Sequence, residues 1–109
     1  MIAYLSGPMT GEMDYKKTFD AAAEKLKKAG VTVINPAGME SVAGDLPYEA
    51  MMKLDLAMLA QADTIVMLSG WEKSLGANRE LGFAMGAGKQ VVEFDKITFE
   101  EESDAGRTE

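Results

Sequence analysis

The chain has 109 residues, of which 47% are hydrophobic, so it is long enough for one domain with an apolar core. It contains neither cysteine nor histidine, which excludes disulfides, Cys/His zinc sites and catalysis by a thiol or an imidazole, and leaves acid–base chemistry to Asp, Glu, Lys or Tyr. The formal net charge of −7 argues against a nucleic-acid polymer as partner, because such binding rests on clustered Lys and Arg, but it leaves open a small nucleotide held by backbone N–H groups.

The sequence carries no membrane signal. No apolar run approaches the roughly 20 residues that cross a bilayer. The first residues, MIAY, lack the basic start and the apolar core of a signal peptide. We therefore expect a cytoplasmic protein without a membrane partner.

The first third of the chain alternates strand and helix patterns. Residues 2–6 are a short apolar run that predicts a strand, and the glycine-bounded loop SGPMTG follows it. Residues 14–29 repeat apolar side chains at helical spacing, and Gly30 is a typical stop signal. The β-branched residues 31–34 predict a second strand.

The middle of the chain is harder to interpret. Residues 37–46 carry no clear pattern and are long enough for a functional loop. Asp45 is a candidate N-cap, with Pro47 in the first turn, for a helix that reaches about Ala62. The apolar side chains expected on the inward face of this helix are Met51, Leu54, Met58, Leu59 and Ala62.

The last third repeats the alternation of strand and helix. Residues 64–68 are uniformly β-branched or large and apolar, which is typical of a strand covered on both faces. The loop SGWEKS breaks this run, and a helical period then begins at Gly76 or Ala77 and stops at Gly88. Residues 90–94 predict a fourth strand.

This order of elements predicts one α/β domain over residues 1–99. We expect a Rossmann-like or flavodoxin-like three-layer sandwich with a parallel sheet of four to five strands in the order 2-1-3-4. The loops that follow strands one and three would then face each other across one crevice at the carboxyl edge of the sheet. Residues 100–109 are acidic and polar, and we expect them to form a disordered tail.

Two carboxylates are expected to meet in this crevice. Glu80 lies near the start of a helix, where the helix dipole favours its ionised form, and Asp55 comes from the preceding helix. Tyr4 or Ser6, from the first strand, could hold Glu80 by a hydrogen bond. Such a pair of carboxylates can cleave a glycosidic bond without a metal or cofactor. The spacing alone favours a simpler role for Glu80, which is to serve only the helix dipole. Asp55 could be a solvated flank residue paired with Lys53 or another cation.

The two crevice loops supply further candidates for ligand contact. The third-strand loop and the helix after it contribute an aromatic plate, a hydroxyl and an amide, from Trp71, Ser74 and Asn78. The first loop brings Ser6, Gly7 and Pro8, which could also be a plain βα turn. The sequence has neither the G-x-G-x-x-G fingerprint of dinucleotide binding nor a P-loop.

Five stretches carry a resemblance to a known family. They are YLSGPMTG at residues 4–11, INPA at 34–37, KLDLAMLAQADTIVML at 53–68, GWEKSLGA at 70–77 and ELGFAMGAGKQVV at 80–92. In this order and with these spacings the sequence resembles the nucleoside 2-deoxyribosyltransferase superfamily, in particular its small bacterial and phage branch of unknown function. The resemblance extends to about Phe94.

The resemblance implies roles for individual residues. Glu80 matches the family nucleophile, which attacks C1′ of a 2′-deoxynucleoside and forms a covalent deoxyribosyl-enzyme. Asp55 matches the aspartate that transfers protons at the base, and Tyr4 matches the tyrosine that orients the nucleophile. Ser74 occupies the position that contacts the 5′ end of the sugar, where the classical transferases carry Asp and the hydrolases of deoxynucleoside monophosphates carry Ser.

The sequence also departs from the family pattern. The monophosphate hydrolases carry an Arg in the first loop where this chain has Thr10, so phosphate binding would rest more on backbone N–H groups near Gly7 and Gly76. Trp71 could stack on the base, act as a lid or lie in a dimer contact. The resemblance further implies a homodimer or a larger homo-oligomer.

Two functions follow from these observations. The first is cleavage of the N-glycosidic bond of 2′-deoxynucleosides or their 5′-monophosphates, by base transfer or by hydrolysis. The alternative is a non-catalytic protein that binds a nucleotide or an ADP-ribose-like small molecule on the same fold. Neither function requires a metal or a cofactor.

Overall fold

The sheet places the loops that follow its two central strands side by side. In the computed structural model, which describes residues 1–39 and 44–99, four parallel strands form one sheet in the order β2-β1-β3-β4. β1 (Ile2–Ser6) and β3 (Thr64–Met67) are central, whereas β2 (Thr32–Ile34) and β4 (Gln90–Glu93) form the edges. The predicted strand order is confirmed.

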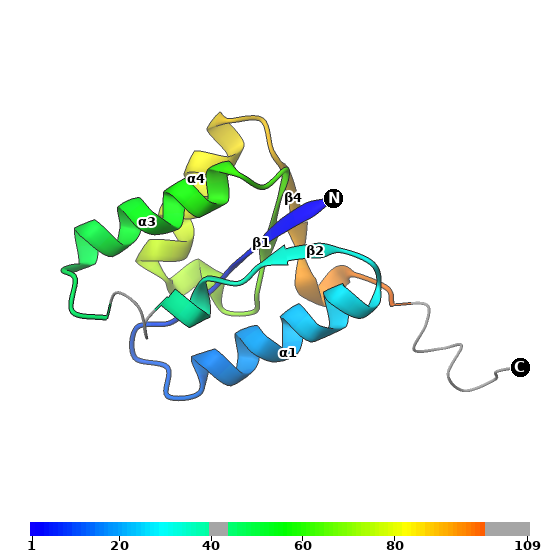
Figure 1. Cartoon of the computed structure of the whole chain (residues 1–109), viewed down its shortest axis with the longest axis horizontal. Coiled ribbons are helices and arrows are strands. Elements are labelled where there is room, and N and C mark those ends of the chain that lie inside the picture. The colour runs from blue at the N-terminus through cyan, green and yellow to red at the C-terminus, as the bar shows by residue number, and fades with distance from the viewer. Residues whose placement is uncertain (40–43, 100–109) are drawn as a thin grey trace, which may run out of the picture.

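Helices cover both faces of this sheet and complete a three-layer sandwich (Figure 1). α1 (Tyr15–Lys28) lies on one face, and α3 (Tyr48–Ala60) and α4 (Leu75–Gly86) lie on the other. Within the described residues, no helix is long and apolar enough to cross a membrane. The predicted tail at 100–109 and part of the uninterpreted segment 37–46 lie outside those residues.

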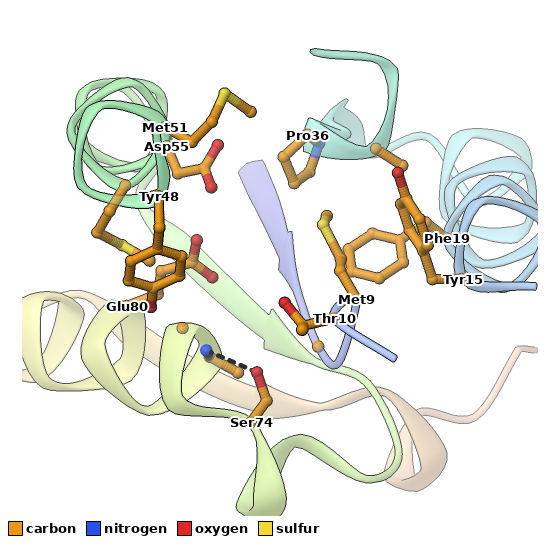
Figure 2. Close-up of a pocket in the computed structure, with 15 residues that line it drawn as sticks. Met9, Thr10, Tyr15, Phe19, Pro36, Tyr48, Met51, Asp55, Ser74 and Glu80 are labelled. Carbon is orange, nitrogen blue, oxygen red and sulfur yellow. Dashed lines mark hydrogen bonds between the residues drawn. The ribbon is translucent and has the colours of Figure 1, made fainter. Parts of the chain in front are cut away.

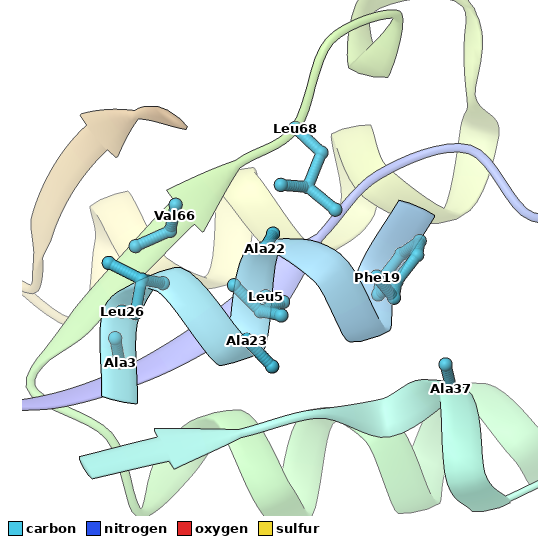
Figure 3. Close-up of a cluster of buried hydrophobic side chains, with 9 residues drawn as sticks. All are labelled: Ala3, Leu5, Phe19, Ala22, Ala23, Leu26, Ala37, Val66 and Leu68. Atoms are coloured by element: carbon cyan, nitrogen blue, oxygen red, sulfur yellow. The ribbon is translucent and has the colours of Figure 1, made fainter. Parts of the chain in front are cut away.

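The alternation of side chains along β1 divides the core into two clusters. Ala3 and Leu5 point toward α1, where they join an apolar cluster with β3 and α1 side chains (Figure 3). Tyr4 points to the opposite face and joins a second cluster beneath α3 and α4. Ser6 shares that face, so a polar pair of β1 side chains is buried under the two helices.

The start of α3 differs from the prediction. Pro47, not Asp45, occupies the N-cap position, and its extended backbone (ψ 159°) prevents the helix from beginning earlier. The inward face also differs, because Met52 is buried with Leu59 while Met51 and Leu54 are only half-buried.

The boundaries of the elements around α4 also differ slightly from the predicted ones. η2 (Trp71–Lys73) is a single 3-10 turn that begins after Gly70, whose φ of 89° is readily adopted only by glycine. α4 begins at Leu75, one residue earlier than predicted, because the Ser74 side chain caps it. β4 ends at Glu93, and Phe94 instead begins the short turn η3 (Phe94–Lys96).

Candidate active site

The Glu80 carboxylate is held on the sheet by two hydroxyl groups. Glu80 lies on the buried face of α4 with Ala77 and Ala84, and its exposed fraction is only 6%. The Tyr4 hydroxyl donates to Oε2 at 2.8 Å and the Ser6 hydroxyl donates to Oε1 at 2.6 Å. Both donors come from β1, so the sheet fixes the orientation of a carboxylate that α4 carries.

Burial and hydrogen bonding act on the Glu80 carboxyl in opposite directions. The net pKa of Glu80 is raised from an ordinary value of 4.5 to about 7, and burial is the largest cause. The nearby charge of Asp55 also raises this pKa, whereas the hydrogen bonds from Ser6 and Tyr4 act to lower it. Burial and the Glu80 charge also raise the pKa of Tyr4 far above its ordinary value, so Tyr4 remains a neutral hydrogen-bond donor.

Asp55 supplies a second carboxyl group from α3. It follows Met52 by three residues and precedes Leu59 by four, so it shares the inward face of the helix with these two buried side chains. Its Oδ1 atom is buried and has no hydrogen-bond partner among the described residues. Burial raises the pKa of Asp55 to about 6. An unpartnered oxygen in this setting favours the protonated carboxyl.

The two carboxyl groups therefore share about one proton between about pH 6 and about pH 7. The higher pKa of Glu80 alone would place this proton on Glu80. The hydrogen bonds favour the opposite arrangement, because both Glu80 oxygens accept from hydroxyl groups whereas Oδ1 of Asp55 accepts from none. Because the two pKa values lie close together, the hydrogen bonds decide the position of the proton and favour Asp55.

Both carboxyl groups line a cavity of about 240 Å³ at the carboxyl edge of the sheet (Figure 2). The side chains on the wall opposite Glu80 and Asp55 are mostly apolar or aromatic: Met9, Tyr15, Phe19 and Pro36. No Lys or Arg from the described part of the chain contributes to the lining. A polar, acidic end and an apolar end suit a ligand that is itself polar at one end and flat and aromatic at the other.

Several residues predicted from the sequence surround the acidic end. Gly7, Ser74 and Gly76 line the cavity together with the two carboxyl groups. The Ser74 hydroxyl accepts a hydrogen bond from the Ala77 N–H at 3.1 Å and so caps α4 (Figure 2). A Cβ atom on Gly7 would lie 2.9 Å from Cβ of Leu68, so only glycine fits there without a shift of the chain.

Five predicted residues lie outside the lining of this cavity: Tyr4 and Ser6, which hold Glu80 from β1, and Pro8, Trp71 and Asn78. Pro8 packs beside Gly70 and borders a neighbouring hollow. The Trp71 ring packs against the cluster beneath α3 and α4, and its buried indole Nε1 has no hydrogen-bond partner among the described residues. The Asn78 amide donates to the carbonyl oxygens of Trp71, Glu72 and Ser74, at 3.3, 3.1 and 2.8 Å, and thereby stabilises the turn before α4.

The sequence reasoning missed Tyr48 as a lining residue. Tyr48 is the first residue of α3 and lines the cavity beside Gly76. It lies seven residues before Asp55, two helical turns away on the same face, and this spacing could have identified it. Among the described residues, no group of three or more acidic side chains is placed to hold a metal ion.

The chain belongs to a family described as a domain of unknown function, DUF4406, whose model matches residues 1–93. A comparison with curated proteins found no match. Among solved structures, the chain is similar to that of the Clostridium botulinum CMP N-glycosidase BcmB, with a TM-score of 0.58 and 22% identity over 85% of this chain and 67% of that one. The likeness to BcmB shows that the two proteins share a fold.

Proposed function

We propose that this DUF4406 protein cleaves the N-glycosidic bond of 2′-deoxynucleosides or their 5′-monophosphates through a covalent Glu80–deoxyribosyl intermediate. The observation that carries the proposal is the geometry of Glu80, a buried carboxylate held by two hydroxyls in a cavity that it shares with Asp55, whose buried Oδ1 has no partner among the described residues. The shared fold with a CMP N-glycosidase and the motif resemblance support it.

The first step forms the covalent intermediate. A Glu80 oxygen attacks C1′ of the sugar, the C1′–N bond breaks, and its electron pair stays on the base nitrogen. Asp55 in its protonated form donates its proton to the departing base. Tyr4 and Ser6 keep the carboxylate oriented for attack, because each holds one of its two oxygens.

The second step releases the sugar and restores both carboxyl groups. Water, or the nitrogen of a second base, attacks C1′ and breaks the bond to Glu80. The Asp55 carboxylate takes the proton that the attacking group loses. Water gives hydrolysis, and a second base gives transfer.

The residues that line the cavity determine how it could hold the 5′ end of the sugar. Ser74 and Thr10 contribute hydroxyl groups to the lining, whereas no Lys or Arg of the described residues does. A 5′-phosphate in this cavity would therefore rest on hydroxyl and backbone N–H groups alone, whereas the neutral 5′-hydroxyl of a nucleoside requires no cation.

Incubation with a panel of 2′-deoxynucleosides and their 5′-monophosphates, with and without free adenine, tests the proposal. Chromatography would detect free or exchanged base, and intact-protein mass would detect a deoxyribosyl adduct. We expect Glu80→Gln to abolish turnover and the adduct while ligand affinity stays within roughly tenfold, about 1.4 kcal/mol. The matched variant Glu24→Gln, on the exposed face of α1, should behave as the wild type.

The outcomes separate the competing functions. Exchanged base would establish a transferase, and free base without exchange a hydrolase. A Glu80→Gln variant with a near-normal rate would contradict the assignment of the nucleophile. A nucleotide that raises the melting temperature without giving product or adduct would favour a binding protein on the same fold.

A further inference from the structure

The two carboxyl groups of the site lie on different helices, so their separation depends on how α3 docks against α4. At Gly76, one turn before Glu80, side chains at the start of α3 lie close to the α4 backbone. A Cβ atom placed there would lie 3.3 Å from Cε of Met52 and 3.5 Å from the Tyr48 hydroxyl. This close contact leaves little room for the start of α3 to move toward α4, but it does not hold the helices together.

Polar contacts at the outer edge of this interface do join the two helices. Arg79 Nη1 and Nη2 donate to Glu49 Oε2 and Oε1 at 3.0 and 3.1 Å, which is a two-pronged pairing of guanidinium and carboxylate. The Arg79 guanidinium also lies over the Tyr48 ring, 5.6 Å from its centroid. The Arg79–Glu49 pair thus makes two side-chain hydrogen bonds between α3 and α4.

In the described part of the chain, the residues just before α3 do little to fix its start. Residues 44–47 are exposed, and Pro47 makes no side-chain capping hydrogen bond. An exposed ion pair of this kind contributes little to global stability. The ion pair does, however, connect the two helices that carry the carboxyl groups. Arg79 precedes Glu80 on α4, and Tyr48 and Glu49 begin α3, which carries Asp55.

We propose that Tyr48, Glu49 and Arg79 form a clamp that docks α3 on α4 and sets the separation of Asp55 from Glu80. The proposal rests on the proposed function for its catalytic consequence. Arg79 is absent from the cavity lining, so it acts as a positioning residue and not through contact with substrate. Catalysis is sensitive to such positioning, since a displacement of about 1 Å can lower a rate by roughly 100-fold.

Substitutions of Arg79 test the clamp. Arg79→Ala should lower kcat by about tenfold with little change in KM, since a shift of less than about 1 Å is enough for that loss. Arg79→Lys keeps the positive charge but lacks the planar fork, so its kcat should lie between those of Arg79→Ala and the wild type. The control Lys96→Ala removes a comparable exposed ion pair, with Glu93, outside the cavity lining and should leave kcat unchanged.

A second readout is independent of turnover. Carboxyl ¹³C titrations would follow Asp55 and Glu80, which face each other and the hydroxyls of Tyr4 and Ser6. If the clamp sets their separation and burial, the pKa values of both groups should move toward ordinary values in Arg79→Ala and by less in Arg79→Lys. If Arg79 acts only through its charge, Arg79→Lys should match the wild type, and this result would overturn the proposal.

The two readouts also separate failure of the clamp from failure of the proposed function. Shifted titrations in a protein that turns over no nucleoside would leave the clamp in place and remove the glycosidase. Turnover and titrations that are both unchanged in Arg79→Ala would overturn the clamp alone. If Arg79→Ala does not fold, Glu49→Gln removes half of the ion pair with a smaller change and should show the same direction in both readouts.

Discussion

β1 contributes to two very different environments on the two faces of the sheet. On the α1 face, Ala3 and Leu5 join a cluster of apolar side chains (Figure 3). On the face beneath α3 and α4, Tyr4 and Ser6 hold the buried carboxylate of Glu80. Neighbouring residues of one strand therefore serve stability on one side and the candidate chemistry on the other.

The two faces of the sheet contribute differently to the stability of this small domain. Burial of apolar side chains on the α1 face is favourable, whereas burial of a carboxylate is costly unless hydrogen bonds offset the loss of water. The two hydroxyl donors offset part of this cost, and the raised pKa of Glu80 shows that the offset is incomplete. Sites of this kind commonly trade stability for activity.

The largest effect that would test this comparison is expected from Asp55→Asn. The variant keeps the shape of the side chain but cannot protonate the departing base, so kcat should fall by roughly 10²- to 10⁴-fold. A substrate whose leaving group departs without protonation should recover most of this loss. The exposed Asp95→Asn serves as the control, and an unchanged rate in Asp55→Asn would return Asp55 to the role of a flank residue.

The pH dependence of kcat in the wild type and in Asp55→Asn gives an independent measurement. The active form has an ionised Glu80 and a protonated Asp55, so the wild-type rate should be highest between about pH 6 and about pH 7. The rate should fall at lower pH because Glu80 becomes protonated, and at higher pH because Asp55 loses its proton. Asp55→Asn should lose the alkaline decline and keep the acidic one.

A pair of β1 variants compares the two faces directly. Leu5 is fully buried, and Leu5→Ala should lower the free energy of unfolding by about 2–5 kcal/mol while kcat of the folded protein stays near that of the wild type. Tyr4→Phe should do the reverse, with a smaller effect on stability and a fall in kcat of roughly 10- to 100-fold from loss of a charge-assisted hydrogen bond. Denaturant unfolding and kinetics would measure both, and equal effects on kcat would contradict the division of labour.

The buried carboxylate should also make stability depend on pH. As pH rises from about 4.5 to about 7, Glu80 and Asp55 become ionised in the unfolded chain, whereas the folded pair retains about one shared proton, so the free energy of unfolding falls. At about 1.4 kcal/mol per pKa unit, the fall amounts to about 3 kcal/mol. Urea unfolding should give a lower free energy of unfolding at pH 8 than at pH 5 in the wild type, and a smaller difference in Glu80→Gln. Equal differences in the two proteins would mean that other groups titrate.

The fold and half of the site could be predicted because they depend on patterns that a sequence displays. Uniform apolar runs identified the central strands, and Gly30 and Gly88, which have φ values of 89° and 74°, lie just after the helices they were predicted to end. The predicted strand order places Tyr4 or Ser6 within reach of Glu80 across the crevice. The structure brings these three side chains together.

The remaining features depend on packing that the sequence does not display. The inward face of α3 turns toward Met52 because Gly76 of α4 leaves space for that side chain, so Asp55 faces inward more directly than the predicted stripe suggested. The directions of Trp71 and Asn78 follow from a 3-10 turn after Gly70, and side chains in such turns follow no simple periodicity.

The smallest expected effect concerns Ser74, which belongs both to the fold and to the cavity. Ser74→Ala removes the cap of α4 and should lower the free energy of unfolding by about 1 kcal/mol. Ser74→Asp can still accept the Ala77 N–H, so it should keep that stability while it places a negative charge at the cavity wall. If Ser74 lies at the 5′ end of the sugar, Ser74→Asp should raise KM for 5′-monophosphates much more than for nucleosides, because the added charge repels phosphate. Equal changes in KM for both substrate classes would confine Ser74 to capping the helix.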